Sequence, residues 1–296
     1  MKTTVLLVNF GAPRTLDEVP LFLRNVLGRD APKPVLEALL ERYQSIGGGS
    51  PLAAITEEQA KLLSEQTERR FTIKSAFRYS PPTLEEKISE CYRSEVERIV
   101  FFIMSPFYTS RTAGSSIRAA ENYLVHLPYT PQVVSVHSWY QEPLFIEAWT
   151  SRIREEVTEG DVFYLFAAHS LPQSLADEPY KTQIERTVQA LAGRLGLRSN
   201  YALGWQSVPQ SVDEPWIGPS VESVIDGISG RIHRLVEVPV GFVSDHLETL
   251  YDMDIVHREY ARSKGLTLSR VSSLNTYPPY ITALKTILQK KLEETP

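Results

Sequence analysis

The chain has 296 residues, of which 42% are hydrophobic, 10% aromatic and 23% charged, and this composition excludes disordered and fibrous proteins. Its 31 Lys and Arg against 36 Asp and Glu give a net charge of −5, so we expect no nucleic-acid partner. A chain of this length can form two domains with separate cores.

Cys91 is the single cysteine, which excludes an internal disulfide framework and a cysteine-ligated iron–sulfur cluster. A reducing, cytoplasmic location fits this cysteine usage best. The apolar stretch at residues 5–10 is too short for a signal peptide or a membrane span, and no later run approaches the ~18 residues that a span needs. We therefore expect no transmembrane segment.

Short apolar runs rich in β-branched and aromatic residues alternate with longer stretches of helical periodicity, beginning in the first half of the chain. Thr83 and Glu86 have the spacing of a capping box at one helix start. Strands are expected at 4–10, 71–77, 98–104 and 132–137, and helices at about 16–27, 35–43, 56–70, 83–92 and 115–124.

The same alternation begins again with a helix at about 143–157. Strands are expected at 161–168, 201–206, 233–240 and 266–271, and helices at 180–195, 221–228, 246–262 and 280–292. Strands that alternate with helices imply βαβ crossovers and parallel sheets, so the fold class is α/β with two similar domains of four strands each. We divide the chain into domains at 1–142 and 143–277, with the closing helix of about 278–296 able to pack back on the first.

Aromatic side chains recur just after the expected strands, where open parallel sheets bind their ligands. A cleft lined in this way suits a large flat apolar ligand, whereas the glycine-rich GxGxxG turn of a nucleotide site is absent. The alternative is that these side chains only fill the edges of two cores. They are Phe10, Phe107, Tyr108, Tyr140, Trp205 and Trp216.

His169 and Glu248 are the candidate reactive side chains. His169 follows the apolar run 162–168, and Glu248 opens a helix with Asp252 one turn on, so that the two carboxylates share a face. Near a neutral histidine these acids could hold a divalent cation or move protons, whereas by themselves they only favour the helix dipole. HExxH, EF-hand and GxSxG motifs are absent, which excludes those resident-metal and hydrolase classes.

Seven segments, in this order along the chain, resemble the ferrochelatase family: 6–13, 42–52, 138–143, 168–172, 204–207, 215–219 and 238–252. The resemblance spans about residues 4–290 and implies two Rossmann-like, chelatase-type domains, each with a four-stranded parallel sheet flanked by helices. It further implies insertion of Fe²⁺ into a free-base porphyrin in haem biosynthesis. Fe²⁺ is then a substrate, with no permanently bound cofactor and no iron–sulfur cluster.

The resemblance assigns His169 and Glu248 as the catalytic pair, and His169, Glu248 and Asp252 as the residues that handle the metal. A free-base porphyrin must lose two pyrrole protons while a hydrated cation loses its waters, so one group should bind metal or accept protons and another should carry protons away. Which of His169 and Glu248 takes the protons stays open.

Within the family, the chain is closest in appearance to the coproporphyrin III enzymes of monoderm bacteria, through segments 22–26 and 42–52. Coproporphyrin III is the favoured substrate and protoporphyrin IX the alternative. Arg42, Ser50 and Tyr140 match positions that contact propionates in that branch, for which cationic and hydroxyl donors are expected. The other expected substrate-binding residues are Phe10, Arg29, Tyr108, Gln206, Ser207 and Trp216.

Two positions depart from the family pattern: Val256 stands where many relatives carry a further acid, and Phe10 stands where some carry tyrosine. Two other functions remain open, a non-catalytic porphyrin or haem carrier and a chelatase for another metal and tetrapyrrole. We expect a monomer that makes transient contacts with neighbouring haem-pathway enzymes.

Overall fold

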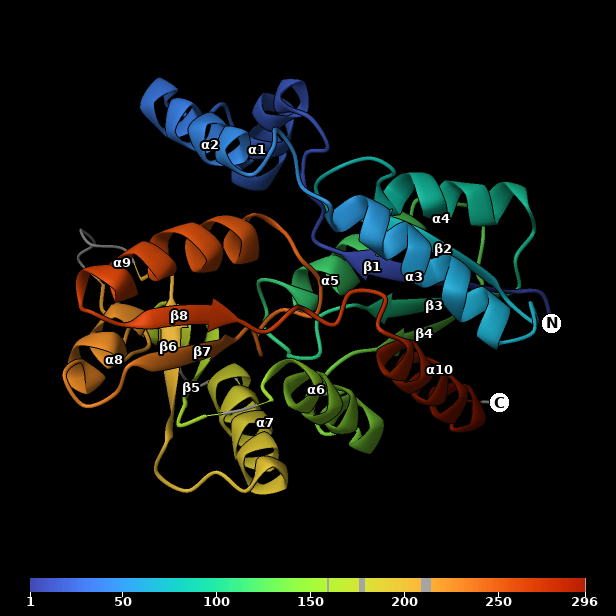
Figure 1. The fold of residues 1–296 in the computed structure, drawn as a ribbon. Coiled ribbons are helices and arrows are strands. Elements are labelled where there is room, and N and C mark those ends of the chain that lie inside the picture. The colour runs from blue at the N-terminus through green and yellow to red at the C-terminus, as the bar shows by residue number, and fades with distance from the viewer. Residues whose placement is uncertain (159, 176–178, 209–213, 296) are drawn as a thin grey trace. The chain divides into compact units, whose positions relative to one another are not determined.

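The buried apolar runs of the chain form two four-stranded sheets, in which every pair of neighbouring strands is parallel (Figure 1). This computed structural model describes residues 1–158, 160–175, 179–208 and 214–295. The chain divides into unit 1, Met1–Trp139 with Asn275–Pro296, and unit 2, Tyr140–Leu274. The expected fold class, two similar α/β domains with four parallel strands each, is confirmed.

The sheet of unit 1 has the order β2-β1-β3-β4, formed by β1 (Thr3–Asn9), β2 (Thr72–Phe77), β3 (Arg98–Ile103) and β4 (Gln132–Val136). One face packs on α4 (Leu84–Arg93) and α5 (Ala113–Leu124) through a cluster that includes Leu6, Ile88 and Phe101. The other face is covered by α3 (Leu52–Gln66) and α10 (Pro278–Glu293), which pack on each other.

The helix boundaries of unit 1 follow local sequence signals. The expected capping box is present at α4, where the Thr83 side chain accepts from the Glu86 N–H and the Glu86 carboxylate accepts from the Thr83 N–H. After β1, a 3₁₀ turn at Leu16–Glu18 leads into α1 (Val19–Leu27) and α2 (Lys33–Ser45). Helix α3 begins earlier than expected, directly after Pro51.

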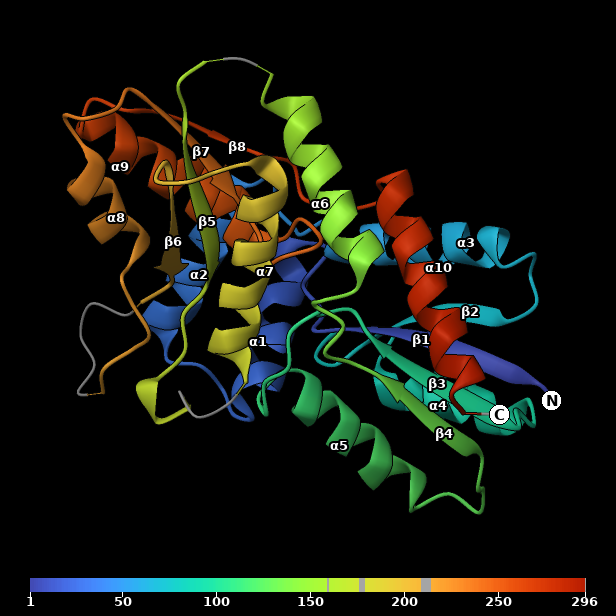
Figure 2. The ribbon, with the colours of Figure 1, turned by 90° about the horizontal axis from the view of Figure 1, so that it is seen from below.

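Unit 2 repeats the topology with the order β6-β5-β7-β8, formed by β5 (Phe163–His169), β6 (Tyr201–Gln206), β7 (Arg234–Val238) and β8 (Thr267–Arg270). Helices α6 (Pro143–Glu156) and α7 (Tyr180–Leu195) pack together, and α7 runs alongside β5 and β6 (Figure 2). A 3₁₀ turn, Gln173–Leu175, precedes α7. The opposite face packs on α8 (Val221–Ile228), a π-helix η3 (Glu248–His257) and α9 (Arg258–Ser263).

One expectation about local structure is wrong. The single helix expected at 246–262 is a π-helix followed by a short α-helix, because the hydrogen bonds of 248–257 run to the fifth residue. Of the two readings of the strand-end aromatics, Phe107 and Trp205 fit the core reading, since each is 1% exposed. No helix among the described residues combines the length and apolarity needed to cross a membrane.

Candidate functional site

The two central strands of unit 2 bring His169 and Glu248 together. In the order β6-β5-β7-β8, β6 lies on one side of β5 while β7 and β8 lie on the other. The boundary between β5 and β7 is therefore the topological switch point of the sheet, and ligands of such sheets bind there, beyond the carboxyl ends of the strands. His169 is the last residue of β5, and the segment after β7 leads to Glu248. Gly241 permits the crossing, because a Cβ there would lie 2.8 Å from the Cα of Ala168.

The Glu248 carboxylate lies between two imidazole rings. Its Oε1 is 3.5 Å from His169 Nε2, and its Oε2 is 3.5 Å from His246 Nε2. The three side chains are between 21% and 32% exposed, so the group is half-buried but open to a ligand. These distances are longer than a normal hydrogen bond and within the range of an ion pair when a ring is protonated.

The other ring nitrogen of each histidine fixes its tautomer. His169 Nδ1 faces the carbonyl oxygen of Ser170, and His246 Nδ1 lies 3.1 Å from that of Ser244. A carbonyl can only accept, so Nδ1 carries a proton, and in its neutral form each ring presents the lone pair of Nε2. Two imidazole lone pairs and a carboxylate thus converge, an arrangement that favours a proton or a cation between them.

Tyr180, the first residue of α7, supports the backbone of His169. Its hydroxyl donates to the His169 carbonyl oxygen at 3.0 Å, and its ring packs 5.9 Å from that of Trp205. Burial raises the pKa of Tyr180, and the negative charge of Glu248 raises it further. Tyr180 therefore stays protonated and serves as a donor to the end of β5.

Arg270 on β8 anchors the segment that carries Glu248. Its guanidinium, 9% exposed, binds Asp254 through Nε–Oδ1 and Nη2–Oδ2 at 3.0 and 2.8 Å and binds Asp245 Oδ1 at 3.0 Å. The Thr249 hydroxyl donates to Asp245 at 3.1 Å and accepts from the His246 N–H at 3.0 Å. The turn before the π-helix is held in this way, and with it the rings of the site.

Asp252 and Val256 follow Glu248 along the π-helix. Asp252 is 9% exposed and therefore largely enclosed within unit 2, whereas Val256 is 39% exposed. An apolar side chain thus occupies the outer position at which many relatives were expected to carry an acid. His246 was not among the expected site residues, although its place two residues before Glu248 was the available signal.

The remaining expected residues of unit 2 differ in exposure. Tyr140 and Trp216 are half-buried, and Ser207 is exposed with a left-handed φ of 60°. Gln206 pairs in register with His169 and is 1% exposed. Neither its amide oxygen nor its amide nitrogen has a hydrogen-bond partner among the described residues. Gln206 is thus enclosed beside the site rather than open to solvent.

The expected substrate-binding residues of unit 1 lie at the end of β1 and in the helical pair that follows it. Phe10 is 41% exposed and packs on Tyr79, with ring centroids 4.6 Å apart. Arg29 is exposed between α1 and α2, and Arg42 is half-buried in the last turn of α2. Ser50 is buried. Its N–H donates to the Pro13 carbonyl oxygen at 2.9 Å.

Tyr108, also in unit 1, is half-buried after β3. Its ring centroid is 5.5 Å from that of His137. Of the six expected aromatic side chains, the four that stay accessible are therefore Phe10, Tyr108, Tyr140 and Trp216.

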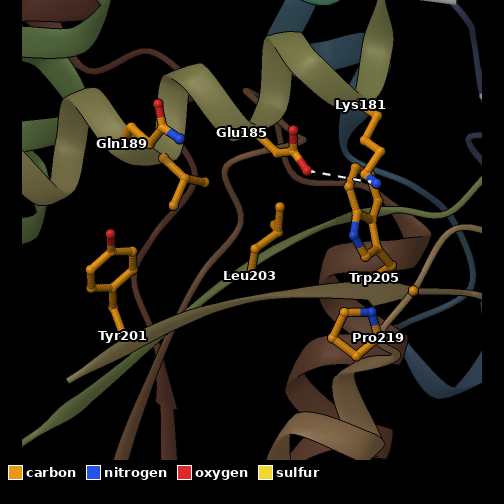
Figure 3. A pocket seen from close by; sticks show the side chains of 9 residues that line it. Lys181, Glu185, Gln189, Tyr201, Leu203, Trp205 and Pro219 are labelled. Atoms are coloured by element: carbon orange, nitrogen blue, oxygen red, sulfur yellow. Dashed lines mark ion pairs between the residues drawn. The ribbon is translucent and has the colours of Figure 1, made fainter. Parts of the chain in front are cut away.

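A groove of about 300 Å³ lies elsewhere on unit 2, between α7 and the edge strand β6 (Figure 3). Leu203 and Trp205 form its floor, and Lys181 and Glu185 of α7 stand over it 3.8 Å apart. None of the expected substrate-binding or catalytic residues lines it. The groove is therefore separate from the His169–Glu248 pair.

Metal ligands are not gathered into a closed cage anywhere in the described part of the chain: no three His, Cys, Asp or Glu side chains there are arranged to hold an ion. The site explains this, because the two Glu248 oxygens face different imidazoles.

Comparison with known proteins identifies the same family as the seven sequence segments did. A family profile described as ferrochelatase matches residues 2–292. Coproporphyrin III ferrochelatase 2 of Bacillus cereus is 33% identical over 310 residues, covering 99% of this chain and 95% of that protein. Coproporphyrin III ferrochelatase of Geobacillus kaustophilus is 34% identical over 314 residues, covering 99% and 97%.

Two solved structures illustrate the likeness of fold. SirB from Bacillus subtilis with Fe³⁺ matches with a TM-score of 0.60 at 13% identity, over 98% of this chain and 96% of that one. CbiX, described as the terminal enzyme for biosynthesis of siroheme in denitrifying bacteria, matches with a TM-score of 0.58 at 10% identity, over 98% and 99%. At these identities the likeness shows the fold alone.

Proposed function

The chain belongs to the ferrochelatase family of metal chelatases, and from this premise we propose that it inserts Fe²⁺ into coproporphyrin III, with His169 and Glu248 as the catalytic pair. As an enzyme of this family acting in haem biosynthesis, it is not the non-catalytic carrier that the sequence left open. The observation that carries the proposal is the convergence of the Glu248 carboxylate with two imidazole Nε2 atoms, each 3.5 Å away.

The arrangement supplies acceptors for the two steps of the reaction. Fe²⁺ must exchange its waters for nitrogen ligands, and a neutral imidazole Nε2 such as that of His169 is a suitable transient ligand. The two pyrrole protons need an acceptor, and Glu248 has one oxygen toward His169 and the other toward His246. A proton taken up by Glu248 at one oxygen can leave from the other toward His246.

Asp252 and Val256 bear on how the hydrated cation approaches. We assign Asp252 to this approach, because it follows Glu248 on the π-helix, and we expect Val256 to remove one acidic contact from the route. Asp252 then affects metal affinity more than the chemical step.

Single substitutions test the catalytic pair. We expect His169→Ala and Glu248→Gln each to fold and to quench their tryptophan fluorescence with porphyrin as the wild type does, while losing most insertion activity. His233→Ala is the matched control, because His233 is an exposed histidine of the same unit. A variant that inserts Fe²⁺ at the wild-type rate removes its residue from the mechanism.

The substrate proposal rests on donors rather than on the catalytic pair. Arg42, Ser50 and Tyr140 present a guanidinium and two hydroxyls, groups that recognise propionates. Coproporphyrin III has propionates where protoporphyrin IX has two vinyl groups, and each donor left unsatisfied costs about 1–3 kcal/mol, or roughly tenfold to a hundredfold. We propose a higher kcat/KM for coproporphyrin III, which equal use of both porphyrins, with and without detergent, contradicts.

Cellular and chemical context completes the proposal. We propose that the enzyme acts as a cytoplasmic monomer without a resident cofactor, with Fe²⁺ and porphyrin as its substrates and transient contacts to neighbouring haem-pathway enzymes. Gel filtration with light scattering tests the oligomeric state, and metal analysis of the protein as purified tests the cofactor expectation.

A further inference from the structure

A buried ion pair joins the end of the π-helix to the sheet. His257 Nδ1 lies 2.8 Å from Glu237 Oε1 on β7, and the two side chains are 4% and 0% exposed. Burial alone lowers the pKa of His257, but the Glu237 carboxylate, its hydrogen bond to the ring, and the charges of Glu222 and Asp252 outweigh burial and raise it. An imidazolium and a carboxylate are therefore paired in the interior of unit 2.

The winding of the helix decides whether this pair can form. In an α-helix each residue advances by about 100°, so Glu248 and His257 would point to roughly opposite faces. In a π-helix the backbone bonds join residues five apart, so side chains four or five apart share a face. Glu248, Asp252 and His257 follow this spacing. Only π-winding lets Glu248 face His169 while His257 reaches Glu237.

We propose that Glu237 and His257 are positioning residues of the enzyme, whose pair holds residues 248–257 in the π-helical winding and so keeps Glu248 facing His169. The inference rests on the catalytic role proposed above for Glu248. π-Helical winding is rare and is found mostly at functional sites, so it needs a tertiary contact that selects it over the α-helix.

The polar character of the pair makes this contact selective. Two apolar side chains at these positions would pack in either winding, whereas α-winding with Glu248 in place would turn the His257 ring away and leave a buried carboxylate without its counter-ion. Burial of this carboxylate is already unfavourable, because Glu237 Oε2 is enclosed with no hydrogen-bond partner among the described residues. The pair thus penalises the alternative winding, as a buried polar residue fixes register in a coiled coil.

The experiment replaces the pair by apolar residues of similar volume, a change that buried ion pairs often tolerate without loss of stability. In the full chain, Glu237→Leu is combined with His257→Met, and crystal structure, insertion kinetics and porphyrin binding are compared with the wild type. Lys264→Met is the matched control, because Lys264 and Asp226 form an exposed ion pair of the same unit, 2.7 Å apart. Glu237→Gln, which retains the acceptor for His257, is the conservative variant.

We expect the double variant to show backbone bonds to the fourth residue over 248–257, with Glu248 moved away from His169. Its kcat should fall by about 10- to 100-fold, as for supporting contacts of metal-handling residues, while porphyrin affinity stays unchanged. Glu237→Gln and Lys264→Met should keep the π-winding and most of kcat.

Retained π-winding in the double variant overturns the inference, and so does altered winding with a wild-type kcat. If the double variant does not fold, His257→Phe combined with Glu237→Gln also removes the pair, and its helical winding and kcat are measured in the same way. Failure of the proposed function can be told apart from failure of this inference. A fully active Glu248→Gln enzyme shows that Glu248 is not catalytic, whereas the helical winding in the crystal structure of the double variant tests the role of the Glu237–His257 pair independently.

Discussion

The two partners of the Glu237–His257 pair should differ in what their loss costs. Breaking a buried ion pair by removing one partner destabilises a protein by about 3–5 kcal/mol, since a charge is left in the interior. His257→Leu leaves the Glu237 carboxylate, which is 0% exposed, and should incur this full cost near pH 6. Glu237→Leu leaves an imidazole that loses its proton and becomes neutral, so its cost should be smaller.

The pH dependence gives this prediction a sign. Burial alone would lower the pKa of His257, but the nearby charge of Glu237 raises it above its ordinary value of 6.5. The charges of Glu222 and Asp252 raise it further. A raised pKa contributes stability that is complete below pH 6.5 and is lost as the pH rises through the folded-state value. The deficit of His257→Leu should therefore be largest below pH 6.5 and shrink as the pH rises toward 9.

Urea unfolding followed by circular dichroism between pH 5 and pH 9 measures these differences. Lys264→Met serves as the reference, because an exposed pair is worth only about 0–1 kcal/mol. Equal destabilisation by His257→Leu and Glu237→Leu at pH 6, or a deficit of His257→Leu that does not change with pH, would refute the assignment of a buried charged pair.

Three further predictions concern single residues. Asp252→Asn should raise the KM for Fe²⁺ more than it lowers kcat, because Asp252 acts on cation approach; a main effect on the porphyrin KM contradicts this. Arg42→Leu should narrow the preference for coproporphyrin III over protoporphyrin IX, measured as the ratio of the two kcat/KM values, and an unchanged ratio excludes Arg42 from propionate recognition. Gly241→Ala should lower the urea midpoint of unfolding, since its Cβ would lie 2.8 Å from the Ala168 Cα. Gly193→Ala should raise the midpoint, because the Cβ would point into open space on helix α7. A higher midpoint for Gly241→Ala than for Gly193→Ala contradicts the close approach of the two backbone segments.

The strands were predictable from the sequence because a parallel strand buried on both faces is a short, nearly continuous apolar run. Runs such as 98–104 and 162–168 therefore marked β3 and β5 directly. The rule that ligands bind beyond the carboxyl ends of parallel strands then directed attention to His169 and to the segment with Glu248. The strands could be predicted because burial on both faces selects apolar residue types along the whole strand.

The π-winding was not predictable in the same way. An apolar period of 3.6 residues favours an α-helix over 246–262, and the choice of a wider turn depends on contacts from other strands, such as Glu237 and Arg270. The sequence left both readings of Trp205 open for a related reason: a residue at a strand end lines a ligand site or a core according to what packs over it, and here that is Tyr180. Partners distant in sequence leave no local signal.

The central claim is that this chain inserts Fe²⁺ through Glu248 and the imidazoles beside it. The most direct test is anaerobic incubation of the purified wild type and Glu248→Gln with Fe²⁺ and coproporphyrin III, followed by absorbance. The wild type should convert the free-base spectrum into that of the iron porphyrin, while Glu248→Gln binds the porphyrin and leaves its spectrum metal-free. A free-base spectrum that persists with the wild type, or equal conversion by both proteins, contradicts the account.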